Sequence, residues 1–417
     1  MKQDYNFKAS KIKNISDEEK VSRRKSLNLF LETGFPNKKN EDWKFTDLNT
    51  ILNKNFDKIT NNFEFDLNKQ LKILKNFDHN YILLTNGVLS ASNFDYEDEN
   101  KIEIKDFKNL EKDTSYVPNT LTLLNNALSL GGYSLKVSDN YKFKKPLIIY
   151  NYFTDNLKNI ILNNRNSIKL NKGSELTTIE YTIESTQNNF IKNTFDTILI
   201  DDDADYKSIF IQDSKSNGHF YRYTKASLEN NSEYQNFILT SGLKFNKFEI
   251  EVNLNKDKGN CSILSALNIA ENEHQEIKTR MNHYAPNCES YQKIKNVVNE
   301  NGKGVYQGKI FVKDVAQKTN AYQLSKALVL NDKAEFDAKP ELEIYADDVK
   351  CSHGSSSGSI DMDAVHYLMT RGIDAESAKQ FLINGFLNDI LEKVPNTNIK
   401  LFLQNILEGQ INGHKKN

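Results

Sequence analysis

The feature that most constrains the fold is a long succession of short segments between about Tyr81 and His353, rich in β-branched and aromatic residues. Asn, Asp, Gly and Lys separate these segments, which is typical of strands joined by short turns. Only residues 121–130 suggest an intervening helix. So many short strands fit either a sandwich or barrel pair or a stacked β-solenoid. The scarcity of proline and the abundance of asparagine at turns favour the solenoid, although no strict sequence period is visible.

Both ends of the chain have helical patterns. Near the N-terminus, Ser16 and Glu19 fit a capping box, and Gly34 is suited to end the helix that follows. After the strand region, Asp361 and Asp374 are each placed to cap a helix. We therefore divide the chain into an N-terminal helical region (1–80), a β core (81–355) and a C-terminal helical region (356–417). The glycine–serine run 354–358 is expected to be a flexible connector between the last strand and the helices.

Composition excludes several classes of protein. A chain of 417 residues predicts two or three structural units, unless an elongated repeat lets one core grow along an axis. The net charge of −1 gives no reason to expect nucleic acid as a partner. No run approaches the roughly 18–20 apolar residues that span a bilayer, so no membrane partner is predicted. Three widely spaced cysteines, Cys261, Cys288 and Cys351, favour a reducing compartment, the cytoplasm before a plastid-type organelle.

One stretch carries residues suited to binding a metal. If residues 340–354 form a strand, Cys351 and His353 lie on the same face, because side chains repeat every two residues along a strand. A thiolate and an imidazole are ligands for iron or zinc, and further ligands would come from another strand or chain. In the alternative interpretation, Cys351 is a buried apolar residue and His353 a hydrogen-bonded turn residue. Cysteine–histidine nucleophilic catalysis is disfavoured, because two neighbours on one strand leave no room for a substrate.

Neither the acidic residues nor any phosphate-binding motif in the sequence indicates a function. The acidic residues between Asp201 and Asp205 lack the spacing of a calcium loop and are expected to form a solvated turn. Asp347 and Asp348 would face opposite sides of a strand, so they do not form the acid–base pair of a β-solenoid polysaccharide enzyme. No phosphate-binding loop is present, so any nucleotide hydrolysis must come from a partner.

The C-terminal part of this sequence resembles a known family. Residues 339–354 read KPELEIYADDVKCSHG, residues 367–373 read YLMTRGI, and near the N-terminus GFP (34–36) precedes EDWKFTDL (41–48). These strings resemble the SufB/SufD family of iron–sulfur cluster assembly proteins, most clearly over residues 300–395. The SufD-type subunit is the better match. The SufB-type cluster-building cysteine falls near Ser325, whereas the SufD-type histidine matches His353.

The resemblance implies a mainly β fold, a right-handed parallel β-helix flanked by helical regions. It also implies a non-catalytic scaffold that pairs with a SufB-type subunit and docks a SufC-type ATPase on its C-terminal helices. A nascent iron–sulfur cluster would then lie between a thiolate of the partner and His353, while the strand spacing adds Cys351 as a candidate ligand. The family also suggests FAD in the assembled complex. The residues predicted to bind partners are Asp374, Ala378, Leu382 and Phe386.

Two other functions are compatible with the pattern. One is a β-solenoid carbohydrate-active enzyme, and the other is a purely structural interaction module without a role in cluster binding. The isolated chain could also pair with a second copy through an exposed edge of the β-helix.

Overall fold

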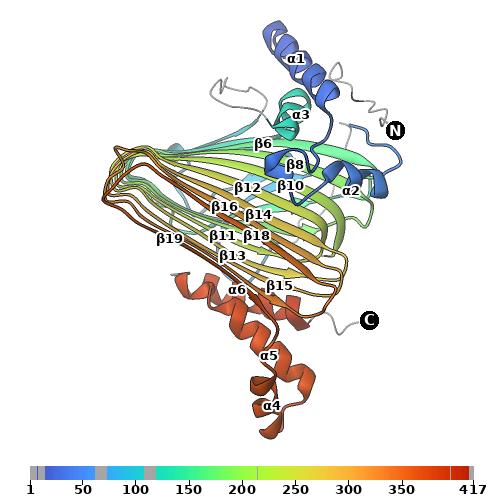
Figure 1. Cartoon of the computed structure of the whole chain (residues 1–417). Helices are drawn as coiled ribbons and strands as arrows, with labels where there is room; N and C mark the ends of the chain where they lie inside the picture. The colour runs from blue at the N-terminus through green and yellow to red at the C-terminus, as the bar shows by residue number, and fades with distance from the viewer. Residues whose placement is uncertain are drawn as a thin grey trace.

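The computed structural model describes residues 7, 15–61, 73–107, 119–213, 215–394 and 396–412. Within these residues, nineteen strands form one continuous sheet system from Asn80 to Gly358, with helices at both ends of the chain (Figure 1). This confirms the predicted fold class, a parallel β-solenoid with terminal helical regions. The strands begin one residue before the predicted core of 81–355 and end three residues after it.

The strands have the following limits: β1 (Asn80–Thr85), β2 (Val88–Asn93), β3 (Ile102–Asp106), β4 (Gly131–Val137), β5 (Leu147–Tyr152), β6 (Ile160–Leu170), β7 (Glu175–Glu184), β8 (Phe190–Ile200), β9 (Asp205–Gln212), β10 (Ser216–Leu228), β11 (Glu233–Thr240), β12 (Leu243–Leu254), β13 (Asn260–Ile269), β14 (His274–His283), β15 (Glu289–Val298), β16 (Lys303–Val312), β17 (Asn320–Val329), β18 (Glu335–Ile344) and β19 (Lys350–Gly358). The helices are α1 (Asp17–Thr33), η2 (Glu41–Trp43), α2 (Leu48–Asn55), η3 (Glu99–Lys101), α3 (Thr120–Leu128), α4 (Met362–Thr370), α5 (Ala375–Asn388), η4 (Leu391–Lys393) and α6 (Thr397–Asn412).

From β4 onward each strand pairs in parallel with the next strand but one, so the chain winds through two facing sheets. One sheet contains β4, β6 and the later even-numbered strands, and the other contains β5, β7 and the later odd-numbered strands. The length of a turn varies. Phe220 lies opposite Asn246, 26 residues on, whereas Lys303 lies opposite Glu335, 32 residues on. This variation explains why the sequence shows no strict period.

The space between the two sheets is filled by the inward side chains of both. Most are apolar and buried, for example Leu135, Ile198, Val252, Ile277 and Ile310. Because alternate residues of a strand point to opposite faces, every strand contributes to this core while its other face stays available to the helices. Each fully buried side chain of this size stabilises the fold by about 1.5–3 kcal/mol, so the core lengthens with every added turn.

Asparagine holds many of the turns. Of the ten non-glycine residues with positive φ in the described part of the chain, seven are asparagines. Their side chains also link successive turns: Asn231 Nδ2 donates to Asp203 Oδ1 at 2.8 Å, and Asn287 Nδ2 donates to Asp257 Oδ1 at 2.7 Å. Asn tolerates left-handed backbone better than most residues, so its abundance at turns has the structural reason that the sequence suggested. The acidic residues from Asp201 belong to such a turn, as expected.

The two ends of the solenoid differ. At the N-terminal end, β2 pairs with β1 and β3 pairs with β4, both antiparallel. At the C-terminal end, β18 pairs with β16 and β19 pairs with β17, and among the described residues no strand lies on the outer edges of β18 and β19. Among the described residues, the solenoid therefore has short antiparallel strands at one end, and at the other the longer strands β18 and β19 with unpaired outer edges; we call the latter the open end.

The N-terminal helices pack on the outer face of the even-numbered sheet. A cluster of buried residues joins Phe30, Leu52 and Leu124 of the helices to Phe195 and Tyr223 of the sheet. As predicted, Ser16 caps α1: its Oγ accepts from the Glu19 amide at 3.2 Å. Gly34, at φ 73°, ends the helix. The predicted helical segment within 121–130 is α3.

The C-terminal helices cover the outer face of the odd-numbered sheet, where Leu387 and Leu403 join a buried cluster with Ile209 and Phe237. Figure 1 shows α5 and α6 beneath the solenoid, with α4 projecting beyond them. The predicted caps are confirmed, since Asp361 accepts from the Ala364 amide at 3.1 Å and Asp374 accepts from the Ser377 amide at 3.0 Å. In the part of the chain that the structure describes, no helix is long and apolar enough to cross a membrane.

The prediction of a flexible connector at 354–358 was wrong. These residues belong to β19, and Leu324 to Leu328 of β17 lie opposite them in register. Glycine and serine are weak strand formers, but a ready ladder of backbone hydrogen bonds on β17 outweighs that local preference. The chain turns toward α4 only after Gly358.

Candidate metal-binding edge

The residues predicted to bind a metal lie on β19, the last strand of the odd-numbered sheet. In register with β17, Cys351 lies opposite Ala321 and His353 lies opposite Gln323. Cys351 packs against the interior cluster, so the residue two positions on, His353, belongs to the same inward-facing row. The structure therefore places both predicted ligands on one face, as the two-residue spacing predicted.

The two residues differ in their access to solvent. Cys351 is half-buried, and burial raises the pKa of its thiol. His353 is exposed, because it lies at the mouth of the solenoid and β19 is the last strand of its sheet. A ring in this position is accessible to a molecule placed against the open end. The described residues contain no group of three or more His, Cys, Asp or Glu side chains that could hold a metal together.

Ser325, where the SufB-type cysteine would fall, lies close to this edge. Its side chain is completely buried on β17, and its Oγ donates to Ser355 Oγ of β19 at 2.8 Å. Ser355 follows Cys351 and His353 in the inward row. A hydroxyl is a poor sulfur acceptor compared with a thiolate, so Ser325 does not offer a nucleophile. Its hydrogen bond with Ser355 instead links β17 to β19, the last two strands of the odd-numbered sheet.

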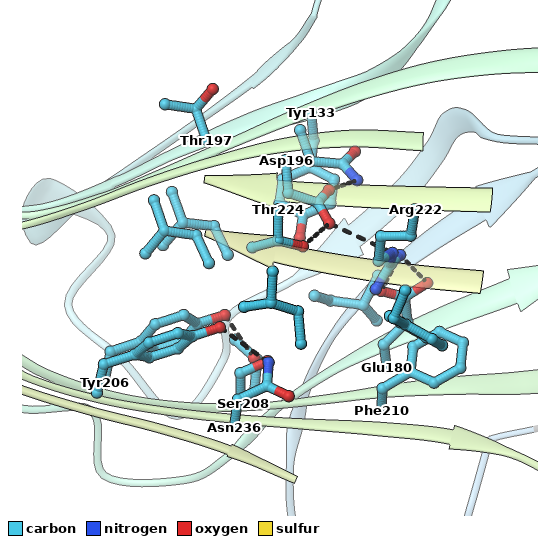
Figure 2. A pocket seen from close by; sticks show the side chains of 18 residues that line it. Tyr133, Glu180, Asp196, Thr197, Tyr206, Ser208, Phe210, Arg222, Thr224 and Asn236 are labelled. Atoms are coloured by element: carbon cyan, nitrogen blue, oxygen red, sulfur yellow. Dashed lines mark hydrogen bonds and ion pairs between the residues drawn. The ribbon is translucent and has the colours of Figure 1, made fainter. Parts of the chain in front are cut away.

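A second concentration of ionisable groups lies deep inside the solenoid (Figure 2). Arg222 of β10 donates to both carboxylate oxygens of Glu180 at 2.7 and 2.6 Å, and its Nε lies 3.3 Å from Asp196. Lys192 and Asn151 also donate to Glu180, at 3.2 and 2.8 Å. We call these five residues the interior ion cluster. Two acids and two bases face one another there, so their charges balance.

The ionisation of the cluster follows from its partners. Burial alone would raise the pKa of Glu180, but the positive charges of Arg222 and Lys192 outweigh it and hold the pKa at about 2. Burial raises the pKa of Asp196, although Arg222 opposes this. The Arg222 guanidinium lies 4.8 Å from the ring centre of Phe210, so an aromatic face also contacts the cation.

The interior ion cluster is unsuited to a polymeric substrate. The cavity beside it has a volume of about 30 Å³ and is lined by side chains such as Tyr133, Tyr206 and Tyr234, which leaves room for roughly one or two water molecules. Glu180 and Asp196 both face the guanidinium of Arg222, but a polysaccharide cannot reach these two carboxylates. Asp347 and Asp348 lie exposed in the turn before β19. The geometry therefore gives no support to a carbohydrate-active enzyme.

The residues predicted to bind partners occupy different environments on α5. Asp374 is exposed and caps the helix, whereas Ala378 is completely buried and offers no contact area. Leu382 and Phe386 are half-buried. Lys295 of β15 lies 4.4 Å from the Phe386 ring centre and donates to its carbonyl oxygen at 2.5 Å. Phe386 therefore anchors α5 to the solenoid.

Other apolar side chains of the same region are exposed. Tyr367 of α4 and Phe381 of α5 are 57% and 60% exposed, and Met362 and Met369 of α4 are exposed as well. The prediction from sequence did not assign these four residues to a partner, because it chose Asp374, Ala378, Leu382 and Phe386 instead. The sequence does contain a sign of this exposed surface, because Phe381 lies on an otherwise polar face of α5.

Comparisons with known proteins agree with this architecture. A family model described as "SUF system FeS cluster assembly, SufBD core domain" matches residues 152–386, and one described as "SufBD protein N-terminal region" matches residues 3–97. The chain is 26% identical over 383 residues to the iron–sulfur cluster assembly protein SufD of Escherichia coli, covering 90% of this chain and 89% of that protein.

Two further relatives match over shorter spans. Protein ABCI7, chloroplastic, of Arabidopsis thaliana is 29% identical over 253 residues, which cover 60% of this chain and 53% of that protein. The SufD protein of Bacillus subtilis is 32% identical over 137 residues, which cover 33% of this chain and 31% of that protein.

A parallel β-solenoid with one open end and terminal helices is thus the structural class of this protein. Since the core model matches more than half of the chain, the protein belongs to the SufBD family of iron–sulfur cluster assembly proteins, and its relatives named above place it on the SufD side of that family.

Proposed function

We propose that this chain is a non-catalytic scaffold subunit of a SUF-type assembly complex, in which it pairs with a SufB-type subunit through the open end of its solenoid. One observation carries the proposal: His353, an exposed imidazole, lies on β19, whose outer edge pairs with no strand in the described part of the chain. An unpaired edge is suited to pairing with another chain, and pairing there would bring the partner's side chains to His353.

The nascent iron–sulfur cluster is the cargo of this site. His353 would supply an imidazole ligand, and Cys351, once deprotonated by the metal, a thiolate. Clusters are commonly held by four protein ligands, so we expect the sister subunit to contribute the others. This expectation separates the scaffold from the purely structural module, which would pair but hold no cluster.

A SufC-type ATPase would dock on the projecting helices α4 and α5. Tyr367 and Phe381 offer exposed aromatic area there, which is typical of contact surfaces. The far end of α5 is fixed to β15, where Asp389 pairs with Lys293 at 2.8 Å and with Lys295 at 2.6 Å. Movement of the docked ATPases would therefore pull on the odd-numbered sheet and open the interface.

The decisive experiment replaces His353 with Ala in the complex co-expressed with a SufB-type subunit and a SufC-type ATPase. We expect the complex to purify intact while cluster accumulation, followed by visible absorbance and iron content, is lost. Ser352→Ala is the matched control, because Ser352 is exposed on the opposite face of the same strand. An undiminished cluster yield in His353→Ala would remove the ligand role.

The same preparations test the remaining expectations. Bound flavin in the assembled complex would be visible by its absorbance, and sizing of the isolated chain would reveal a homodimer formed through the same edges. We also expect a reducing, cytoplasmic setting, because none of the three cysteines is in a disulfide.

A further inference from the structure

A polar bridge crosses the interior directly beneath His353. Gln323 of β17 is the neighbour of His353 in register, and it is only 2% exposed. Its Oε1 accepts from Tyr306 Oη at 3.1 Å, and its Nε2 donates to the backbone carbonyl of Glu341 at 3.1 Å. Tyr306 belongs to β16 and Glu341 to β18, so one side chain connects the odd-numbered sheet to the last two strands of the even-numbered sheet.

The surrounding residues fix this amide in one orientation. Tyr306 is completely buried, and its single hydroxyl proton is shared between Gln323 Oε1 at 3.1 Å and Gln292 Oε1 at 3.2 Å. Turning the Gln323 amide over would place its oxygen against the carbonyl oxygen of Glu341, where no proton is available. Gly308 of β16 leaves the necessary space, since a Cβ there would lie 2.2 Å from both Gln323 Oε1 and Tyr306 Oη.

The bridge determines where the imidazole of His353 can lie. The side chain of Gln323 fills the level immediately below the ring, and its polar atoms are already used by Tyr306 and Glu341. An imidazole turned inward would therefore have to compete with these two hydrogen bonds of Gln323. Without the bridge, the carbonyl of Glu341 would lose the Gln323 amide as its donor, and an imidazole N–H turned inward could replace it.

We propose that Gln323 is a positioning residue, which holds the imidazole of His353 at the mouth of the solenoid for the shared cluster. This inference rests on the proposed function for its biological meaning, but the position of the ring can be measured on the isolated chain. Gln323 would not contact the metal. Its role is to keep a potential ligand turned outward before the partner arrives.

The test measures how fast diethyl pyrocarbonate modifies His353, followed by peptide mass spectrometry on the folded full-length chain. Gln323→Met keeps the volume of the side chain and removes both hydrogen bonds. One hydrogen bond made only by the inward ring changes the ratio of the inward to the outward position by about fivefold. The modification rate of His353 should therefore fall, by up to about fivefold as the inward position becomes dominant. His366, exposed on α4, is the internal control and should keep its rate.

A second variant covers a failure of Gln323→Met to fold, which far-ultraviolet circular dichroism would reveal. Tyr306→Phe removes one of the two hydrogen bonds of Gln323 and keeps the ring, so a smaller fall in the same rate is expected. An unchanged rate for His353 in the folded variants would overturn the positioning role.

Cluster assembly separates this inference from the proposed function. In the complex, Gln323→Met should pair normally and accumulate less cluster, and it should cause no further loss when combined with His353→Ala. If Gln323→Met slows modification but leaves cluster yield normal, the bridge has no role in assembly and the inference fails. If His353→Ala itself leaves the yield normal, the proposed function fails, whatever the modification rates show.

Discussion

The interior ion cluster provides the prediction whose size follows most directly from the structure. Glu180→Gln removes one charge with almost no change in shape. The pKa of Glu180 falls from its ordinary 4.5 to about 2 in the folded chain. One pKa unit corresponds to about 1.4 kcal/mol, so the ionised carboxylate stabilises the fold by about 3 kcal/mol at neutral pH. We expect Glu180→Gln to lower the free energy of unfolding by that amount.

The pH dependence gives the prediction a distinctive sign. Because folding depresses the pKa, the stabilisation is complete above pH 4.5 and is lost as the pH falls toward 2. The wild-type carboxylate takes up a proton on unfolding in this window, whereas the glutamine does not. The difference between wild type and Glu180→Gln should therefore shrink by about 1.4 kcal/mol between neutral pH and about pH 3.5.

Urea unfolding followed by circular dichroism at both pH values measures these quantities. The matched control is Glu175→Gln on the same strand, where Glu175 pairs with Lys142 and the two side chains are 46% and 64% exposed. Exposed pairs contribute roughly 0–1 kcal/mol, so this control should change little. An equal difference between wild type and Glu180→Gln at the two pH values would refute the assignment of the stability to the ionised carboxylate.

Three further perturbations test other parts of the structure. Gly308→Ala should cost about 2 kcal/mol, because its methyl group would overlap Gln323 Oε1 and Tyr306 Oη, which breaks the hydrogen bond between them at about 1 kcal/mol and overpacks the core at about 1 kcal/mol or more. Gly358→Ala, which has open space around its Cβ, should change the urea midpoint little. Lys247→Met leaves the fully buried carboxylate of Glu276 without its 2.6 Å partner, so the free energy of unfolding should fall by about 3–5 kcal/mol. A fall of less than about 1 kcal/mol would show that the remaining hydrogen bonds of Glu276 are enough to stabilise its charge. Asp389→Asn should speed hydrogen exchange in α5 while lowering overall stability by less than about 1 kcal/mol; unchanged exchange would mean that the apolar contacts alone hold the helix.

Local patterns in the sequence predicted the local structure well. The caps of α1, α4 and α5 follow from single side chains such as Ser16, Asp361 and Asp374, because a cap is a contact within one turn of helix. The spacing of Cys351 and His353 likewise gave their common face. The exposure of His353 required the structure, since it depends on β19 being the last strand of its sheet.

The features that the sequence did not reveal depend on distant partners. Gln323 meets Glu341, 18 positions away, and Arg222 meets Glu180, 42 positions away. Unequal turn lengths hide the register that brings such residues together. Ala378 was assigned to a partner because an apolar stripe on a helix predicts burial without saying against what; in this chain the residue is buried internally.

The contrast between the two ends of the solenoid limits how many solenoids can join end to end. A repeat protein with two bare ends could add molecules indefinitely and grow into a fibre. The antiparallel strands β2 and β3 are only six and five residues long, against ten and nine in β18 and β19, and short edge strands pair poorly with other chains. Association is therefore expected through the longer edges, and growth stops once two such ends have met. End-to-end association then stops at a dimer, whether the second molecule is a sister chain or another copy of this one.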